Sequence, residues 1–282
     1  MHDNGSVMVW LLLLCCAQPL REGCEEGEIY DRGICEKYKA GDPVDSTGVW
    51  KPPPETTWQW QLTKPIDTSL DVEMYDVDLF GARDDAFDAL EGKIRICYFS
   101  AGSWEEWRDD VDAVSNDALG ATLENWDDER WFDVMHPTVR TLMTDRLDYA
   151  VERGCDGVEP DNVDGYANVS GFPLTAAEQL DFNRFLADEA HNRGLSVGLK
   201  NDLDQLEALE PWFDWALNEE CAAYDECGRM KVFTDAGKAV FHTEYVDDWA
   251  DAEELAAEVC GIGKLSTLVK TWDLGPEFLD CP

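Results

Sequence analysis

The chain has 282 residues, of which 44% are apolar, so it is long enough to bury one sizeable core. It carries 61 acidic against 22 basic residues, for a formal net charge of −39. This balance disfavours nucleic acid and anionic membrane surfaces as partners, because phosphate binding needs a basic face. The acidity is typical either of solubility in salty surroundings or of attraction toward a cationic substrate, and composition alone favours the first.

The N-terminal segment reads VMVWLLLLC over residues 7–15, an apolar run too short to span a bilayer, with small residues before Gln18. We predict a signal peptide over residues 1–17 and a secreted protein with no stable membrane span after its removal. A retained anchor or a core segment is the alternative, since residues 1–7 contain no Lys or Arg and carry Asp3. Residues 18–47 are predicted to form a lead-in with a local disulfide, and residues 48–282 the main domain.

Removing residues 1–17 leaves eight cysteines: Cys24, Cys35, Cys97, Cys155, Cys221, Cys227, Cys260 and Cys281. An even number in a secreted chain favours disulfides over metal ligands, and no pair has the C-x-x-C spacing. The economical expectation is local pairing of 24 with 35, 221 with 227 and 260 with 281. Cys97 and Cys155 are then left as possible buried free thiols.

Eight strand-like runs recur along the rest of the chain, at 57–62, 71–80, 93–102, 155–161, 195–202, 213–220, 239–246 and 265–274. Helical periodicity separates several of them, at 136–154, 175–194 and 251–263, and glycine follows the first two helices directly. Helix 136–154 has one apolar face, formed by Val139, Leu142, Met143, Leu147, Ala150 and Val151. Helix 175–194 opens with Thr175 and Glu178 at capping-box spacing.

This alternation of strand and helix predicts a (β/α)₈ TIM-type barrel. The connections 63–70 and 81–92 are too short for full helices, so some βα units should be degenerate. An open doubly wound sheet is the alternative fold.

The active site of such a barrel lies at the C-terminal ends of its strands, and those ends are unusually acidic here. Polar residues there include Asp76, Asp78, Tyr98, Glu159, Asp161, Asn162, Asp164, Lys200, Asp202, Asn218, Glu219 and Glu244. Glycoside hydrolysis needs two carboxylates in different environments, one ionised and one protonated. The fourth and sixth strands lie about 10 Å apart at ~4.8 Å per neighbour, so Asp161 and Glu219 could act together. Taken singly, each of these residues is more often a helix cap or turn former.

No metal or cofactor is expected. The run D-N-V-D-G at 161–165 lacks the regular spacing and distal Glu of a calcium loop. Trp104, Trp107, Trp126 and Trp131, between the third and fourth strands, could stack on sugar rings or pack the connection onto the barrel.

Several of these segments together resemble glycoside-hydrolase family 114, the endo-α-1,4-polygalactosaminidase family. The likeness rests on PPPETTWQWQL (52–62), YDVDLF (75–80), ICYFSAGSWE (96–105), DGVEPDNVDGY (156–166), LSVGLKND (195–202) and FDWALNEECAAYDEC (213–227). It extends from about residue 48 to about residue 275. The family often has Gln where this chain has Glu220, which introduces a second carboxylate beside Glu219.

The resemblance implies a secreted enzyme that cleaves within α-1,4-linked galactosamine polymers, with Asp161 and Glu219 as the catalytic pair. The sugar pocket would then be formed by Trp60, Asp76, Tyr98, Glu159, Asn162, Asp164, Lys200, Asn218 and Glu244. Because de-N-acetylated galactosamine is cationic, Glu159, Asp164 and Glu244 are candidates to bind its amines. A monomer is expected. The alternatives are a non-catalytic barrel that binds cationic polysaccharide, or a glycosidase for another α-linked sugar.

Overall fold

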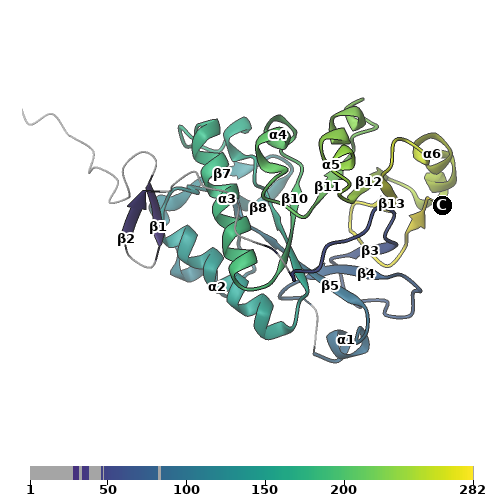
Figure 1. The fold of residues 1–282 in the computed structure, drawn as a ribbon, viewed down its shortest axis with the longest axis horizontal. Helices are drawn as coiled ribbons and strands as arrows, with labels where there is room; N and C mark the ends of the chain where they lie inside the picture. Colours follow the sequence, from purple (N-terminus) through teal and green to yellow (C-terminus); the bar gives the residue numbers. More distant parts are fainter. Residues whose placement is uncertain (1–27, 32–33, 38–45, 47, 82–83, 282) are drawn as a thin grey trace, which may run out of the picture.

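The computed structural model describes residues 28–31, 34–37, 46, 48–81 and 84–281. Its centre is a curled sheet with strand order β14-β13-β12-β11-β10-β9-β5-β4-β3, in which only β14 is antiparallel to its neighbour (Figure 1). The strands are β3 (Trp58–Gln61), β4 (Met74–Asp78), β5 (Ile94–Ser100), β9 (Gly157–Asp161), β10 (Ser196–Lys200), β11 (Trp215–Glu219), β12 (Val240–Val246), β13 (Ser266–Thr271) and β14 (Leu279–Asp280). All eight predicted strands are confirmed.

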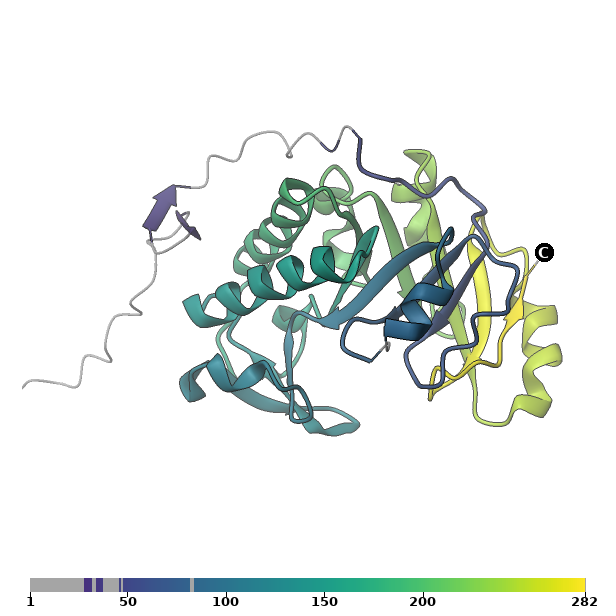
Figure 2. The ribbon, with the colours of Figure 1, turned by 90° about the horizontal axis from the view of Figure 1, so that it is seen from below.

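The two ends of the parallel series approach each other through side chains. The Trp58 indole Nε1 donates to the Ser266 carbonyl at 3.0 Å, and Lys270 Nζ donates to Gln59 Oε1 at 3.1 Å. These contacts bring β3 against β13, so the sheet curls round on itself, as Figure 2 shows from below. The fold is therefore the predicted (β/α)₈ barrel.

The connections between strands are uneven, as predicted. Their helices are α1 (Asp84–Ala89), α2 (Pro137–Arg153), α3 (Ala176–Asn192), α4 (Leu206–Leu209), α5 (Lys231–Asp235) and α6 (Ala252–Val259). Short 3₁₀ turns are η1 (Val111–Ala113), η2 (Asn116–Ala118), η3 (Gly165–Ala167), η4 (Leu203–Gln205), η5 (Cys227–Met230) and η6 (Trp249–Asp251). Helices α2 and α3 have 17 residues each, whereas α1, α4 and α5 have six or fewer. The prediction that some βα units are degenerate is thus confirmed.

The ends of the two long helices follow from the sequence. Thr175 and Glu178 form the predicted capping box at the start of α3, and Gly154 ends α2 with a φ of 79°. One part of the face prediction is wrong, because Val151 is 46% exposed. The buried face of α2 includes Arg146 and Ala150, and a residue one step past Ala150 rotates about 100° away from it.

The period of two along each strand separates two apolar layers. One layer fills the barrel and contains Trp58, Trp60, Met74, Ile96, Trp215, Leu217, Phe241 and Leu268. The alternate positions of the same strands, such as Val77, Cys97, Val158 and Ala216, pack with the helices in a second, larger cluster. Any strand-end residue that shares parity with the inner layer therefore points toward the barrel mouth.

Two small antiparallel sheets lie outside the barrel strands. In the β5–β9 connection, β6 (Ser103–Glu105), β8 (Trp126–Phe132) and β7 (Leu119–Leu123) pair in the order β6-β8-β7. Sequence reasoning treated this segment only as a long loop. Its tryptophans divide evenly, with Trp104 and Trp131 packed inward and Trp107 and Trp126 about half exposed. Strands β1 (Glu28–Asp31) and β2 (Ile34–Lys37) pair within the lead-in.

Three disulfides join described residues. The predicted pairs Cys221–Cys227 and Cys260–Cys281 are confirmed. Cys97 and Cys155 are also bonded, with their Cα atoms 6.0 Å apart, so the alternative of two free thiols is wrong. Cys97 lies on β5 and Cys155 lies just before its neighbour β9, which brings together residues 58 positions apart.

The remaining N-terminal predictions lie outside the described residues, namely the signal peptide and the Cys24–Cys35 pair. Among the helices of the described chain, none combines the length and apolarity needed to cross a membrane.

Candidate active site

A buried ammonium group lies at the centre of the barrel mouth. Lys200, the last residue of β10, has its Nζ 3.0 Å from Glu159 Oε1, 3.2 Å from Asp161 Oδ1 and 3.2 Å from Glu219 Oε2. Burial lowers the pKa of Lys200, but the negative charges of Asp161, Glu159 and Glu219 outweigh the effect of burial. The pKa of Lys200 is therefore raised well above its usual range. Lys200 is therefore a permanent cation that holds three carboxylates from β9 and β11 together.

Asp161 ends β9 and is reachable from solvent, with 19% of its side chain exposed. Its Oδ2 accepts a hydrogen bond from the Tyr98 hydroxyl at 3.0 Å, and its Oδ1 accepts one from the Asn162 amide at 2.7 Å. Together with Lys200, these donors fix the carboxylate in one orientation. A carboxylate held in this way is suited to act as a nucleophile or a base.

Glu219 ends β11 and is also reachable, with 26% of its side chain exposed. Its Oε1 accepts from the Tyr245 hydroxyl at 2.5 Å, and its Oε2 accepts from Asn201 Nδ2 at 3.0 Å. Asn201 Oδ1 also accepts the Glu219 backbone amide at 3.0 Å, so one side chain holds both ends of this residue.

The separation of these two carboxylates is bounded by Lys200. One oxygen of each lies 3.2 Å from the same ammonium nitrogen, so those oxygens are no farther apart than twice that distance. Paired carboxyl groups of glycosidases lie about 5–9.5 Å apart across the two stereochemical classes. Asp161 and Glu219 are therefore close enough to act on opposite sides of one glycosidic bond.

Below this pair lie two buried acids, Asp76 and Glu159, whose pKa values are both raised. Burial, and then the adjacent Glu159, raise the pKa of Asp76 well above its usual range. Burial raises the pKa of Glu159 to about 7, against the opposing effect of Lys200. Burial thus favours the neutral form of both carboxyl groups. Both residues are fully buried, so they act on substrate only through Lys200.

The structure divides the other predicted pocket residues by strand parity. Trp60 is buried, and its ring lies 4.6 Å from Lys200 Nζ, where it forms the wall behind the cation. Asn218 and Glu244 have outward parity and are buried behind the mouth. Asn218 Nδ2 donates to Asn201, and Glu244 Oε1 accepts the Ala222 amide at 2.7 Å.

Asn162 and Asp164 lie partly exposed in the turn after β9. Burial, followed by the charge of Asp161, raises the pKa of Asp164 to about 6. Asn168 Nδ2 donates to this carboxylate at 3.2 Å. Of the predicted pocket, Tyr98, Asn162 and Asp164 thus lie at the accessible mouth beside Asp161.

Sequence reasoning missed Tyr245 and Asn201, which both bind Glu219. Parity is the signal that would have identified Tyr245, since it lies two and four residues beyond the inward-facing Thr243 and Phe241. Asn201 follows the strand end and has a φ of 47°, a conformation that Asn tolerates better than most residues. Its role depends on a turn that periodicity does not describe.

A chain of hydroxyl groups supports the turn that carries Asp161. Asn162 Nδ2 donates to Ser100 Oγ at 2.9 Å, and Ser103 Oγ donates to Glu129 Oε2 at 2.6 Å. The two serine hydroxyls are 2.5 Å apart, so the network is continuous from β8 of the inserted sheet to the turn that carries Asp161. Gly102 is required there, because a Cβ at this position would lie 1.7 Å from the Asn162 carbonyl oxygen.

The buried carboxyl of this network predicts a pH effect on stability. Burial raises the pKa of Glu129 from 4.5 to about 7, and the Ser103 hydrogen bond only partly opposes it. A group whose pKa is higher in the folded state than in the unfolded state contributes its full stability at pH values below its unfolded pKa. This contribution is lost as pH rises through its folded pKa. The free energy of unfolding should therefore fall between pH 4.5 and about 7, by up to about 3 kcal/mol from this group.

Glu129→Gln should flatten this fall, because the amide can still accept from Ser103 but cannot ionise. Urea unfolding at several pH values measures the effect. Glu124→Gln, at an exposed position in the same inserted sheet, is the matched control. An unchanged pH curve in Glu129→Gln would contradict the prediction.

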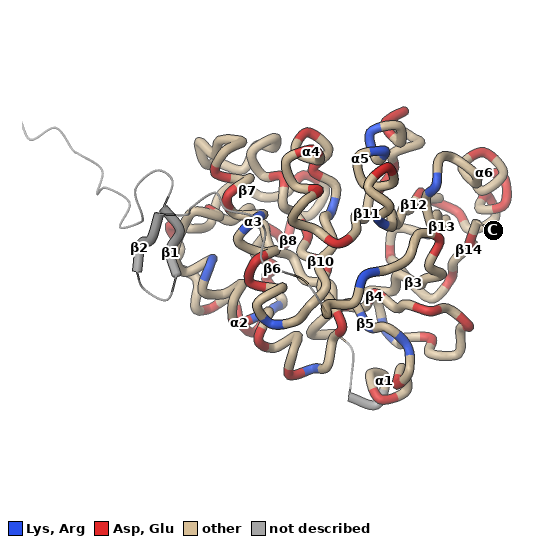
Figure 3. Tube along the Cα trace, viewed as in Figure 1, with Lys and Arg blue, Asp and Glu red and all other residues tan. Residues whose placement is uncertain are grey.

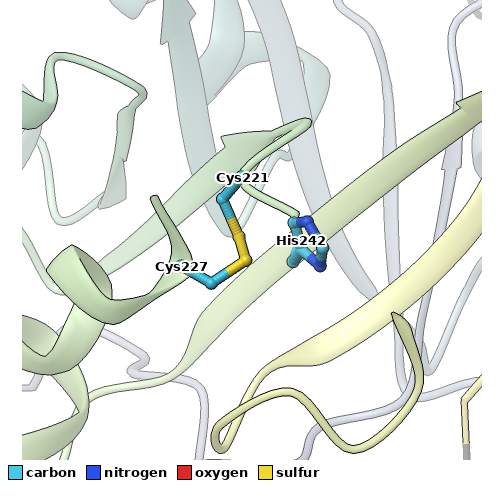
Figure 4. Close-up of side chains that lie close together, drawn as sticks. All are labelled: Cys221, Cys227 and His242. Atoms are coloured by element: carbon cyan, nitrogen blue, oxygen red, sulfur yellow. A yellow bond between two sulfur atoms is a disulfide. The ribbon is translucent and has the colours of Figure 1, made fainter. Parts of the chain in front are cut away.

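One further cluster lies behind Glu219, on the side away from the mouth. Cys221, Cys227 and His242 have ligand-type atoms within 4.8 Å of one another (Figure 4). Both thiols are consumed by the disulfide, and the two His242 nitrogens bond Thr267 at 3.0 Å and Glu244 at 2.8 Å. The cluster is therefore structural and lies between the loop after Glu219 and β12.

Comparison with known proteins supplies the context for this geometry. The profile of glycoside-hydrolase family GH114 matches residues 40–281. The crystal structure of Aspergillus fumigatus Ega3 in complex with galactosamine is 41% identical, covers 82% of this chain and 97% of that chain, and has a TM-score of 0.78. The glycoside hydrolase domain of PelA from Pseudomonas aeruginosa is 16% identical, covers 81% and 98%, and has a TM-score of 0.63, which shows a shared fold.

No match emerges among curated proteins. The family match covers most of the chain, and the strand-end carboxylates that the family resemblance implied lie together at the mouth of a barrel. On these grounds the chain belongs to glycoside-hydrolase family GH114 and is a glycoside hydrolase.

Proposed function

We propose that this protein is a secreted, endo-acting hydrolase of α-1,4-linked galactosamine-containing polysaccharide. The observation that carries the proposal is the pair Asp161 and Glu219, held around Lys200 at the barrel mouth of a chain 41% identical to a protein crystallised with galactosamine. Three disulfides among the described residues support secretion, since such bonds persist in oxidising compartments.

The proposed reaction uses the two carboxyl groups in different roles. Glu219 gives a proton to the glycosidic oxygen, so that the leaving sugar departs as a neutral alcohol. Asp161 attacks the anomeric carbon as a nucleophile and forms a glycosyl ester that water then cleaves, or it activates the water that attacks that carbon directly. Tyr245 and Asn201 orient Glu219, Tyr98 orients Asp161, and Lys200 contacts both carboxyl groups.

Substrate charge offers a reason for the acidic mouth. Galactosamine units without acetyl groups are ammonium ions at neutral pH, and Asp164 lies partly exposed at the mouth near Asp161. Acidic residues also recur on the helices and loops all around the barrel (Figure 3). The charge therefore surrounds the site as well as lining it, which suits long-range steering of a cationic polymer.

Ionic strength tests this steering. Raising salt from about 0.05 M to about 0.5 M should lower kcat/KM on de-N-acetylated polymer by about tenfold, because screening removes the attraction. The same enzyme on fully N-acetylated, uncharged polymer should change little and is the control. A flat response on the charged polymer would overturn the steering and leave solubility as the reason for the acidity.

A reducing-end assay tests the function itself. Partly deacetylated galactosaminogalactan should release new reducing ends together with a rapid fall in chain length, the mark of internal cleavage. Other α-1,4-linked polymers, such as amylose and polygalacturonate, serve as comparison substrates. Faster cleavage of either would replace the proposed substrate class, and release of single sugars from chain ends would contradict endo action.

A further inference from the structure

One tryptophan at the barrel mouth has no part in the site described so far. Trp272 follows the last residue of β13, and its ring stacks on Tyr245 with centroids 4.1 Å apart and an angle of 18° between the planes. Tyr245 in turn donates its hydroxyl hydrogen bond to Glu219. A single aromatic ring thus separates Trp272 from the proposed catalytic acid.

The exposure of this tryptophan differs from that of its counterparts inside the barrel. Trp58, Trp60 and Trp215 are 0–1% exposed, whereas Trp272 is 49% exposed. It has the same parity as the inward-facing Leu268 and Lys270 but lies one step beyond the strand, above the packed interior. With Tyr245 against one face, the exposed half of the ring is presented at the level of the mouth.

The surroundings of Trp272 are acidic. Asp273 follows it directly and is exposed, with its Oδ1 accepting from the Thr271 hydroxyl at 2.5 Å. Asp247 and Asp248 follow β12, the strand of Tyr245, and are exposed as well. An aromatic face among carboxylates attracts a ring that has an apolar face and a positive charge, because stacking and cation attraction then act together.

We propose that Trp272 is the stacking platform of a sugar-binding subsite next to the cleaved bond and that it takes an amino-sugar ring of the polymer. The inference rests on the proposed function, since it assigns a place to a neighbouring unit of the same substrate. Tyr245 then has two roles, because it orients Glu219 and also supports the platform. The subsite lies on the β12–β13 side of the mouth, across β11 from Asp161.

The test is the split of the kinetic constants in variants of this ring. Trp272→Ala should raise KM on de-N-acetylated polymer by about tenfold with kcat within about twofold, because a platform binds the ground state and transition state alike. Trp272→Phe should restore most of the affinity. The control is Val151→Ala, at an apolar side chain 46% exposed on α2, which should leave KM unchanged.

Each outcome separates the platform from its rivals. A Trp272→Ala enzyme with lower kcat and unchanged KM would overturn the proposal, because the ring would then serve only to hold Tyr245. Equal KM effects in Val151→Ala and Trp272→Ala would also overturn it, since the effect would not belong to this position. If the wild-type enzyme cuts the polymer and Trp272→Ala has the same kinetic constants, the platform alone is refuted. A wild-type enzyme that leaves the polymer uncut would refute the proposed function, and the platform with it.

Discussion

Asp161→Asn and Glu219→Gln should each lower kcat on the galactosamine polymer by about 10³-fold or more, with the melting temperature nearly unchanged. Asn at position 161 cannot attack or activate water, and Gln at position 219 has no proton to give to the leaving oxygen. Both amides can still accept the hydrogen bonds of Tyr98 and Tyr245, so the fold should persist. Reducing-end kinetics and thermal unfolding measure the two effects.

The neighbouring carboxylate provides the control for this pair. Glu220 follows Glu219 with a φ of 57°, and burial, followed by the charges of Glu219 and Glu244, raises its pKa. Glu220→Gln restores the residue that the family often has here and should retain most of the activity. If Glu220→Gln were as inactive as Glu219→Gln, the acid would have to be reassigned. Near-normal cleavage by Asp161→Asn and Glu219→Gln would overturn the two-carboxylate mechanism.

The second large effect is expected from Lys200→Met. The substitution removes the cation shared by Glu159, Asp161 and Glu219, and leaves a fully buried carboxyl at Glu159 without its partner. Breaking a buried ion pair from one side costs about 3–5 kcal/mol. We expect a loss of free energy of unfolding near that size at pH 8, together with loss of activity, because Asp161 and Glu219 lose their common anchor.

A double variant distinguishes loss of charge balance from loss of packing. Without Lys200, the folded pKa of Glu159 should rise further above its unfolded value. The penalty is therefore present at high pH and shrinks as Glu159 takes up a proton at low pH. Lys200→Met with Glu159→Gln should regain stability at pH 8 and remain inactive. If urea unfolding shows no recovery in the double variant, the Lys200 effect is one of packing.

Much of the fold could be predicted because strand and helix periods are local. The eight strands and the helices α2 and α3 follow from alternation, capping and glycine placement. The acidic strand ends then predicted Asp161 and Glu219 as neighbours, since parallel strands of a barrel end at one face. The Cys221–Cys227 and Cys260–Cys281 bonds were predicted from short sequence separation.

Other contacts between distant segments were not predicted, because periodicity does not record which side chains meet. The Cys97–Cys155 disulfide depends on β5 and β9 being neighbours, and the sheet of β6, β7 and β8 depends on pairing within a long connection. Glu244 was expected at the mouth, but it has outward parity and contacts His242. Tyr245 has inward parity and contacts Glu219 instead.

By itself the sequence determined the barrel, its degenerate units and the two carboxylates that end β9 and β11. The tertiary structure alone decided that Lys200 joins those carboxylates, that burial raises the pKa of Asp76 and of Glu159, and that Trp272 lies against Tyr245. The physical reason is that strand order and parity are encoded locally, whereas the charge of a buried group and the partner of a ring depend on atoms brought together only when the sheet curls and its ends meet.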